Sequence, residues 1–454
     1  MSENDFSSLG LIPALYNNLL SLNFQQMTGV QQQCLPLILA GQDVIAQAST
    51  GSGKTAAFAL AILQRLEPRV LQPQALVLCP TRELADQVAN EFRRLARLLP
   101  NIKVMTLCGG RPVAVQASSL EHGAHIVVGT PGRIEDHLRR GSLHTGSIRY
   151  LVLDEADRML DMGFLPSVHA VVAELPAHEQ RQTLLFSATF EDSTDALAAS
   201  VMHNPVRVTV DDHADLPDIE QLNYRIRDDS QRQQALETLL QHYQPATALV
   251  FCSTRADVDE VCGRLNHHGF SALGLHGDME QRDRDIAMIR FVNGSARVLV
   301  ATDIAARGLD VQGLDLVVNY QPARDEATHT HRIGRTGRAG ATGRACSLVT
   351  AADGEVSLEL PVLSSVQNPR SSAGLAAEKV TLWLDAGKRD KIRPGDVLGA
   401  LTADGRLRAD DIGKITLTAQ YCCVAVAQGQ QHLAVTILQE HKLKGKRVRC
   451  RILS

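Results

Sequence analysis

The chain has 454 residues, 44% of them hydrophobic, and a formal net charge of −4 at pH 7. This length allows roughly three domains, each with its own core. No apolar run approaches the roughly 18 residues that cross a bilayer, and the start "MSENDFSSLG" lacks the basic, then apolar, pattern of a signal peptide. We therefore expect a cytoplasmic protein with no membrane contact. Its nine scattered cysteines, without a C-x-x-C pair, indicate reduced thiols.

The charge is unevenly distributed along the chain. From residue 376 to residue 454 there are 14 Lys and Arg against 8 Asp and Glu, which leaves 32 against 42 for the rest. A solvated basic surface would explain this excess. So would a module that binds a polyanion, and both interpretations stay open at this point.

Apolar segments alternate with helix-like segments through most of the chain. Between residues 43 and 210 the runs "ALVLCP", "HIVVGT", "YLVLDE" and "TLLFSAT" alternate with amphipathic stretches, which predicts a parallel sheet covered by helices on both faces. We assign residues 1–210 to this first α/β domain. After an acidic, Pro-containing linker at 211–221, "ALVFCST", "RVLVAT" and "DLVVNYQ" repeat the pattern and predict a second α/β domain at 222–352.

A third region follows a linker at 353–376, where "NPRSSAGLAAE" is small, polar and punctuated by Pro and Gly. Residues 377–454 then read as strand "KVTLWLD", helix "RPGDVLGALT", strands "KITLT" and "YCCVAV", helix "QQHLAVTILQEH" and strand "KRVRCRIL". The order βαββαβ is that of RNA-recognition folds. We therefore expect a small α+β domain at the C-terminal end.

The segment "ASTGSGKT" at 48–55 lies between an apolar run and a helical pattern. Gly51 and Gly53 let the backbone curl so that its N–H groups surround phosphate oxygens, Lys54 supplies a positive charge, and Thr55 offers a hydroxyl to Mg²⁺. Ala48 stands where the strict motif has its first Gly. The strand, loop and helix context still predicts a phosphate-binding loop.

The segment "LVLDEADRML" at 151–160 ends an apolar run with three acids. In a parallel sheet this run would end at the same edge as the phosphate loop, which places Asp154 near a nucleotide-bound Mg²⁺ and Glu155 beside an attacking water. A helix N-terminus enriched in acids is the alternative explanation.

These and further motifs resemble, in order from residue 6 to about 350, the DEAD-box RNA helicases. The first half contains "PTRELADQ", "GG" at 109 and 110, "TPGR", "DEAD" and "SAT"; the second contains "VFCSTR", "HGDMEQRDRD", "ATDIAARGLD" and "HRIGRTGR". Two departures occur in the segment that resembles the family's adenine-reading region, where Asn23 and Met27 replace the usual Gly and Pro. They put the backbone geometry of that segment in question, but not the role of Gln31.

The resemblance implies two tandem RecA-like domains and assigns roles to individual residues. The catalytic residues would be Lys54, Asp154, Glu155 and the arginine fingers Arg335 and Arg338. The ATP-binding residues would be Phe6, Gln31, Ser49, Thr50, Gly51, Ser52, Gly53, Lys54, Thr55 and Asp310, with Thr55 and Asp154 as the metal ligands. RNA would contact Arg82, Gly109, Gly110, Thr130, Arg133, Thr254, Arg284, Thr302, Asp303 and Arg307 through its backbone, without reading of the bases. Asp157, Ser187, Thr189 and His331 would couple the two domains.

The third region is similar to the C-terminal module of ribosome-assembly members of this family. That similarity implies a monomer that uses ATP and Mg²⁺, grips a hairpin of 23S rRNA and acts on pre-50S ribosomal particles. The usual RNP1 string is absent, and the nearest stacking candidates, Trp383 and Tyr421, fit a core position equally well. The basic residues Lys442, Lys444, Lys446, Arg447 and Arg449 either contact phosphate or form a solvated basic end.

We therefore expect an ATP-dependent RNA helicase that locally unwinds short RNA duplexes. One alternative is an ATP-dependent RNA clamp, which predicts a damaged hydrolytic set, whereas Glu155, Arg335 and Arg338 are all present. A general RNA helicase with another RNA target is a second. A DNA helicase built on the same paired domains is a third, which the motif set and the RNA-type tail disfavour.

Overall fold

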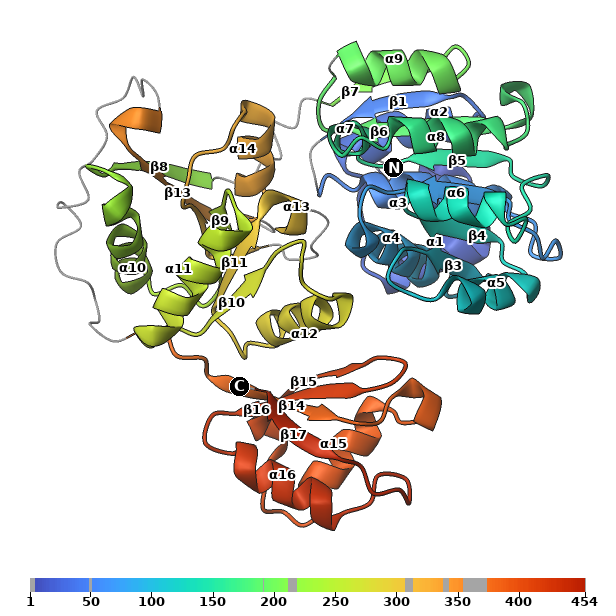
Figure 1. Ribbon diagram of the computed structural model, residues 1–454. Helices are drawn as coiled ribbons and strands as arrows, with labels where there is room; N and C mark the ends of the chain where they lie inside the picture. Colours follow the sequence, from blue (N-terminus) through green and yellow to red (C-terminus); the bar gives the residue numbers. More distant parts are fainter. Residues whose placement is uncertain are drawn as a thin grey trace. The chain divides into compact units, whose positions relative to one another are not determined.

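The computed structural model describes residues 5–48, 51–190, 192–210, 219–306, 313–337, 343–353 and 374–453 (Figure 1). Contacts within the chain divide it into two compact units, with the main boundary after residue 216. The first unit is one α/β domain, and the second contains another α/β domain and the C-terminal domain. All nine cysteines are free thiols, as the sequence predicts.

The first unit is built on a seven-stranded parallel sheet in the order β3-β4-β2-β5-β6-β1-β7. Its strands are β1 (Val44–Gln47), β2 (Ala75–Leu78), β3 (Val104–Leu107), β4 (Ile126–Gly129), β5 (Tyr150–Leu153), β6 (Gln182–Ser187) and β7 (Val206–Thr209). Its helices are α1 (Pro13–Ser21), α2 (Gly29–Leu39), α3 (Lys54–Arg65), α4 (Arg82–Leu95), α5 (Val113–Glu121), α6 (Pro131–Arg139), α7 (Ala156–Asp161), α8 (Leu165–Ala173) and α9 (Asp192–Val201).

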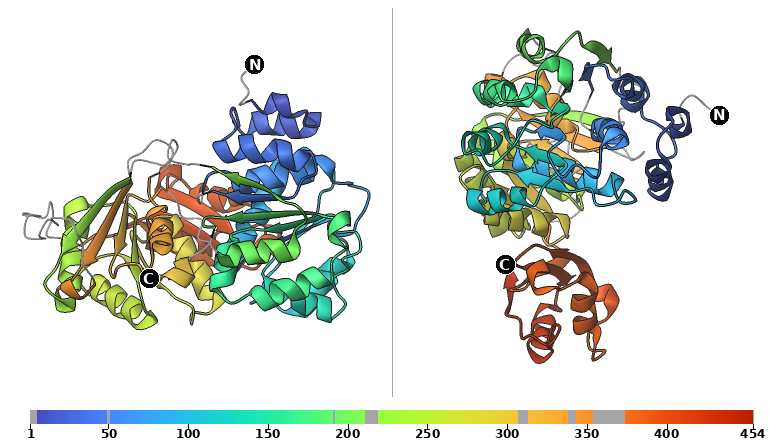
Figure 2. Two further views of the ribbon diagram at one scale, coloured as in Figure 1. Left: turned by 90° about the horizontal axis from the view of Figure 1, so that it is seen from above. Right: turned by 90° about the vertical axis from the view of Figure 1, so that its right-hand side faces the viewer.

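Helices cover both faces of this sheet, because its central strands are apolar on both sides. On one face Phe58 of α3 packs against Phe92 of α4 and Phe186 of β6, with ring centroids 5.9 and 5.3 Å apart. The opposite face has its own core, which includes Leu185, the residue before Phe186 in β6, and Met159 of α7. Helices α1 and α2 lie on the outer side of this unit, against α3 (Figure 2).

The second unit begins with a six-stranded parallel sheet in the order β10-β11-β9-β12-β13-β8. Its strands are β8 (Ile219–Arg225), β9 (Ala248–Cys252), β10 (Ala272–Leu275), β11 (Val298–Thr302), β12 (Leu316–Asn319) and β13 (Gly343–Val349). Its helices are α10 (Arg232–Tyr243), α11 (Arg255–His267), α12 (Gln281–Val292), α13 (Asp303–Ala306) and α14 (Glu326–Ile333). One core joins α10 and α11 to alternate residues of the strands, such as Val250 and Val300.

The C-terminal domain is a four-stranded antiparallel sheet in the order β15-β16-β14-β17, with two helices on one face (Figure 1). Its elements are β14 (Lys379–Leu384), α15 (Pro394–Thr402), β15 (Ile412–Leu417), β16 (Cys422–Ala427), α16 (Gln431–Glu440) and β17 (Cys450–Leu453). This is the predicted βαββαβ order. The predicted fold class, two parallel-sheet domains and a small α+β domain, is confirmed.

The structure differs from the sequence-based expectation in three places. Strand β8 begins at Ile219, inside the predicted linker 211–221, the rest of which lies outside the described residues. The last strand begins at Cys450 rather than at 446, because Lys444 and Gly445 adopt left-handed φ angles of 47° and 81° and form a turn. Leu375, in the predicted linker 353–376, is fully buried in the core of the second α/β domain.

Candidate nucleotide and RNA sites

The predicted phosphate loop is held by the N-terminal end of α2. Gly53 has φ = 94°, a conformation that favours glycine, and a Cβ at this position would collide with the Nε2 atom of Gln31. Gln31 Nε2 donates a hydrogen bond to the Gly53 carbonyl at 3.2 Å. The Gln31 amide therefore contacts the phosphate loop directly, and only glycine fits between them.

Thr28 is a second support of this loop, which the sequence analysis did not identify. Its Oγ1 donates to the Ser52 carbonyl at 2.6 Å, and its backbone N–H donates to Gln31 Oε1 at 3.0 Å. The pattern T-x-x-Q at 28–31 is a helix capping signature, and it could have located this residue. The same two side chains that begin α2 therefore also fix the phosphate loop.

The two departures in this segment, Asn23 and Met27, occupy positions that their side chains tolerate. Asn23 has φ = 59°, the left-handed region, which Asn tolerates better than most residues, so it can stand where the family has Gly. Met27 is buried at 7% exposure. Phe6 is also buried, at 1% exposure, with its ring 6.1 Å from that of Phe24, and its predicted stacking on adenine stays a prediction.

A buried acid and a buried base face the same edge of the sheet. Lys54, at the start of α3, donates from Nζ to the Ala48 carbonyl at 2.9 Å. Asp154, directly after β5, is 2% exposed, and its Oδ1 has no hydrogen-bond partner among the described residues. Burial raises the pKa of Asp154 to about 7, against the opposing effect of Lys54. An unused carboxylate oxygen at this position suits a hard divalent cation.

Glu155 follows with an unusual backbone. Its φ of 53° lies in the left-handed region, which costs an L-residue about 1–2 kcal/mol. It is the residue at which the chain turns from β5 into α7, and its side chain is only half-buried. Backbone strain of this kind clusters at functional sites, which agrees with the role predicted for Glu155.

Asp157, one turn into this segment, binds the "SAT" motif. Its Oδ2 accepts hydrogen bonds from the backbone N–H groups of Ala188 at 3.1 Å and Thr189 at 3.3 Å. Ser187 Oγ donates to the Thr189 carbonyl at 2.7 Å. Three of the predicted coupling residues therefore meet within the first unit. The fourth, His331, lies on α14 of the second unit, and the coupling itself stays a prediction.

The RNA candidates of the first unit gather around the carboxyl ends of β3 and β4. The Arg82 guanidinium packs on the two glycines, because a Cβ at Gly109 would lie 2.8 Å from its Nη2, and Gly110 has φ = 78°. Thr130 begins α6 and donates its backbone N–H to the Leu107 carbonyl at 3.2 Å. Arg133 lies in the first turn of the same helix.

The RNA candidates of the second unit also lie beyond strand ends or on a following helix. Thr254 precedes α11, and its Oγ1 donates to Asp257 Oδ2 at 2.7 Å. Thr302 ends β11, and Arg284 lies in the first turn of α12. Asp303 is committed to an ion pair with Arg332, which the sequence analysis did not identify. Ser49, Thr50, Arg307, Asp310 and Arg338 lie outside the described residues, whereas Arg335 is described and is 6% exposed.

Strand β16, in the sheet of the C-terminal domain, carries no aromatic side chain. Trp383 of β14 lies on the face away from the helices, with the Arg451 guanidinium 4.8 Å from its ring and the Tyr421 ring 6.1 Å away. On β16 this face carries Cys423 and Ala425, because their neighbours belong to the core under the helices. A typical RNA-recognition sheet instead stacks two or three bases on aromatic residues.

Basic side chains gather in two loops of this domain that contact each other. Lys444 Nζ donates to the Lys391 carbonyl at 2.6 Å and pairs with Asp396 at 3.1 Å; Lys446 pairs with Asp390 at 3.1 Å. Within the described residues, the exposed basic side chains of these loops that make no hydrogen bond or ion pair are Lys388, Arg389, Lys391, Arg393, Lys442, Arg447 and Arg449. The sequence analysis had not singled out the run "KRDKIR" at 388–393, although its charge density is the signal that marks it.

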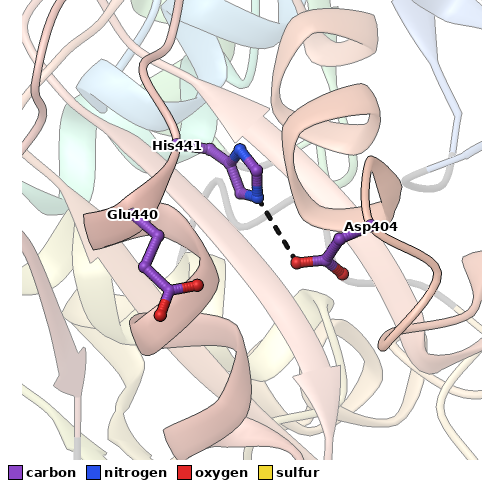
Figure 3. Close-up of side chains that lie close together, drawn as sticks. All are labelled: Asp404, Glu440 and His441. Carbon is purple, nitrogen blue, oxygen red and sulfur yellow. Dashed lines mark hydrogen bonds and ion pairs between the residues drawn. The ribbon is translucent and has the colours of Figure 1, made fainter.

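A cluster that resembles a metal site occurs in the same domain, where Asp404, Glu440 and His441 lie close together (Figure 3). Arg406 already neutralises it, since its Nη2 is 2.6 Å from Asp404 Oδ2 and also contacts Glu440. Hydrogen bonds from Arg406 hold the pKa of Asp404 well below its usual range. The cluster is a surface ion-pair network, and its guanidinium occupies the place a cation would take.

Comparisons with known proteins agree with this arrangement. The DEAD/DEAH box helicase model matches residues 28–197, the helicase conserved C-terminal domain matches 231–340, and the DbpA RNA binding domain matches 381–452. The chain is 50% identical to the ATP-dependent RNA helicase DbpA of Escherichia coli over 99% of both chains. It is 40% identical to the DEAD-box ATP-dependent RNA helicase CshA of Geobacillus kaustophilus, over 76% of this chain and 73% of CshA.

A solved structure shows the same fold for the two α/β domains. Dbp5 of S. cerevisiae, bound to RNA and ADP BeF3, superposes with a TM-score of 0.69 at 32% identity, covering 80% of this chain and 93% of that chain. No described helix is long and apolar enough to cross a membrane. The chain therefore belongs to the DEAD-box ATP-dependent RNA helicases, with two RecA-like domains and a DbpA-type RNA-binding domain.

Proposed function

We propose that this helicase remodels RNA of the large ribosomal subunit, acting as a monomer in the cytoplasm on pre-50S particles. The identity to DbpA across both chains, including the C-terminal domain, supports this target. In our proposal the C-terminal domain holds a 23S rRNA hairpin, and the RecA-like domains act on short duplexes nearby. Because the core contacts RNA backbone rather than bases, target choice falls to the C-terminal domain.

The observation that carries this assignment is the basic surface made by the loops at 388–393 and 442–449. Seven exposed basic side chains without a partner among the described residues lie on two loops, which are joined by the Lys444 to Lys391 hydrogen bond and the Lys446 to Asp390 ion pair. The sheet face, by contrast, lacks stacking aromatics on β16. We infer that the hairpin binds the loop surface through its phosphates rather than the sheet through its bases.

Charge reversal on this surface tests the proposal. In the full-length protein, Arg447→Glu with Arg449→Glu should weaken stimulation of ATP hydrolysis by hairpin-containing 23S rRNA fragments, but not by oligouridine. Lys414→Glu with Arg408→Glu is the control, because it makes the same charge change elsewhere on the domain. Equal stimulation by both RNAs in the wild-type protein would refute the ribosomal target. If the Arg447→Glu, Arg449→Glu variant still prefers hairpin-containing 23S rRNA fragments over oligouridine, the hairpin does not bind this loop surface.

At the nucleotide site we propose that the chain binds ATP with Mg²⁺. Thr55 and Asp154 would hold the metal, which on binding neutralises phosphate charge. Lys54 would bind phosphate oxygens, and Glu155 would accept a proton from the attacking water. Arg335 and Arg338 would stabilise charge that develops on the γ-phosphate. Gln31 would select adenine, and its hydrogen bond to Gly53 would couple the binding of adenine to the conformation of the phosphate loop. The buried, unpartnered Asp154 Oδ1 supports the metal assignment.

The division between binding and hydrolysis can be tested at two positions. Lys54→Ala should remove ATP binding, whereas Glu155→Gln should keep binding and block turnover, because Glu155 acts only on the water. Binding of a fluorescent ATP analogue and phosphate release measure the two steps. An RNA clamp that needs no turnover would instead keep its RNA-remodelling activity in Glu155→Gln.

A further inference from the structure

Two RNA-facing segments of the first unit are joined by a buried side chain that no motif includes. Gln116 of α5 is 4% exposed, and its Nε2 donates to the Cys108 carbonyl at 3.0 Å. Cys108 directly precedes the Gly109–Gly110 pair. Gln116 Oε1 accepts a hydrogen bond from Arg133 Nη1 at 2.7 Å. One amide therefore links the glycine pair to the "TPGR" motif.

Arg133 is also hydrogen-bonded to the residue that follows the glycine pair. Arg133 Nη1 also donates to the carbonyl of Arg111, the residue after Gly110, at 2.9 Å. These two bonds use both hydrogens of Nη1. Among the described residues no hydrogen-bond partner is seen for Nη2 and Nε. This edge of a guanidinium suits two oxygens of one phosphate.

His137, one turn further along α6, fixes the orientation of the Gln116 amide. It is fully buried, its Nε2 lies 3.1 Å from Gln116 Oε1, and its Nδ1 lies 2.8 Å from Ser142 Oγ. Because Gln116 Nε2 is occupied by a carbonyl, Oε1 must face two donors, and His137 must carry its proton on Nε2. Burial, with Arg133 nearby, lowers the pKa of His137, which keeps the ring neutral at pH 7.

We propose that Gln116 is a positioning residue for RNA binding: it holds the Arg133 guanidinium beside the Gly109–Gly110 segment so that both contact one stretch of RNA backbone. The inference rests on the proposed contact between Arg133 and RNA. Without Gln116, the bond to the Arg111 carbonyl is the one hydrogen bond seen among the described residues that would still hold the half-buried Arg133 side chain, which then becomes freer to rotate. Ordering that side chain would then oppose RNA binding.

The test uses full-length protein and oligouridine, which lacks the hairpin. Gln116→Met keeps the volume and removes all three side-chain hydrogen bonds. It should raise the RNA concentration for half-maximal ATPase stimulation by about fivefold to tenfold, with kcat and ATP binding nearly unchanged. The slope of log affinity against log salt should fall, by up to about 0.7 for one lost phosphate contact. Gln74→Met is the control, because Gln74 is equally buried and hydrogen-bonded to Glu67 and Val70 at the start of β2.

A double-mutant cycle separates the inference from the contact on which it rests. If Gln116 acts through Arg133, the double variant Gln116→Met, Arg133→Ala should bind RNA no more weakly than Arg133→Ala alone. Additive losses would overturn the positioning role, as would normal RNA affinity in Gln116→Met while Arg133→Ala is impaired. Normal affinity in Arg133→Ala would overturn the proposed RNA contact itself. If Gln116→Met does not fold, Gln116→Asn, which keeps the amide but shortens its reach, should give the same pattern.

Discussion

Arg332 and Asp303 form a two-point ion pair inside the second RecA-like domain, with Nε 2.7 Å from Oδ1 and Nη2 2.8 Å from Oδ2. Arg332 is 2% exposed, and its Nη1 also donates to Asn319 Oδ1 at 3.1 Å and to the Gln321 carbonyl at 2.9 Å. One guanidinium therefore joins α14, the end of β12 and the start of α13. Arg332 therefore anchors the "HRIGRTGR" motif within this domain.

Loss of this anchor should destabilise the domain. Arg332→Ala leaves Asp303 without its partner in a mostly buried site, and we expect the free energy of unfolding to fall by about 3–5 kcal/mol. The exposed pair of Arg255 and Asp278 is the control, where Arg255→Ala should cost about 0–1 kcal/mol. Urea denaturation measures both. Equal small losses would mean that the pair does not anchor the motif.

Glu155 allows strain and catalysis to be separated. Glu155→Gln retains the left-handed backbone and removes the base, so we expect unchanged thermal stability with ATP turnover reduced by orders of magnitude. Glu155→Gly also removes the base and relieves about 1–2 kcal/mol of strain, partly offset by about 0.5–1 kcal/mol of chain entropy. It should therefore unfold at the same temperature as wild type or slightly higher. A clear loss of stability in Glu155→Gly would show that the φ of 53° carries no strain.

Arg335 should affect the rate and not the binding of ATP. Its side chain is 6% exposed at the end of α14, and an arginine finger acts on charge that develops only in the transition state. We expect Arg335→Lys and Arg335→Ala to lower RNA-stimulated turnover by on the order of 10³-fold, with a much smaller change in ATP affinity. Equal losses in rate and affinity would instead assign Arg335 to ground-state binding.

The sequence predicted the fold well wherever a pattern was local. Apolar runs located the central strands, and the phosphate loop, "DEAD" and "SAT" motifs stand where strand ends meet. Asp157 meets Ala188 and Thr189, which lie 31 and 32 positions further along the chain, whereas the coupling of the two domains by these residues stays a prediction. The βαββαβ order of the tail also followed from periodicity alone.

What the sequence did not predict depends on contacts between distant residues of ordinary type. Gln116 and Thr28 are polar residues in or beside helical segments. The residues next to them in the sequence do not indicate that Gln116 hydrogen-bonds to Cys108 or that Thr28 hydrogen-bonds to Ser52. Leu375 lies in a polar stretch that reads as linker, yet it is buried, because a single apolar residue gives no periodicity. Such positions become visible only when the fold brings their partners together.

The buried His137 should make the first RecA-like domain sensitive to acid. Its pKa is lowered by burial and by Arg133 and Arg140, with Asp136 opposing, whereas an unfolded histidine titrates near 6.5. The unfolded chain therefore binds the proton more tightly, so the stability contributed by neutral His137 is present above about pH 6.5 and is lost as pH falls below it. The stability difference between wild type and His137→Gln should shrink from pH 7.5 to pH 5 in urea denaturation. A difference independent of pH would contradict the lowered pKa.

Leu375 sets where the helicase core ends, and truncation can show it. Leu375 is fully buried beside Leu265 and Phe270, and its carbonyl accepts the Ser271 N–H at 2.7 Å. A fragment that ends at Asp353 lacks this side chain, whereas one that ends at Ala376 keeps it and still omits the C-terminal domain. We expect the shorter fragment to be less stable by about 2–5 kcal/mol, the cost of removing a buried Leu side chain.

Both fragments should hydrolyse ATP with oligouridine at temperatures where they are folded, and both should lose the preference for hairpin-containing 23S rRNA. Leu375→Ala in the full-length protein should reproduce the loss of stability while the RNA preference remains. If the two fragments are equally stable, the core ends at Asp353 and Leu375 belongs to the linker.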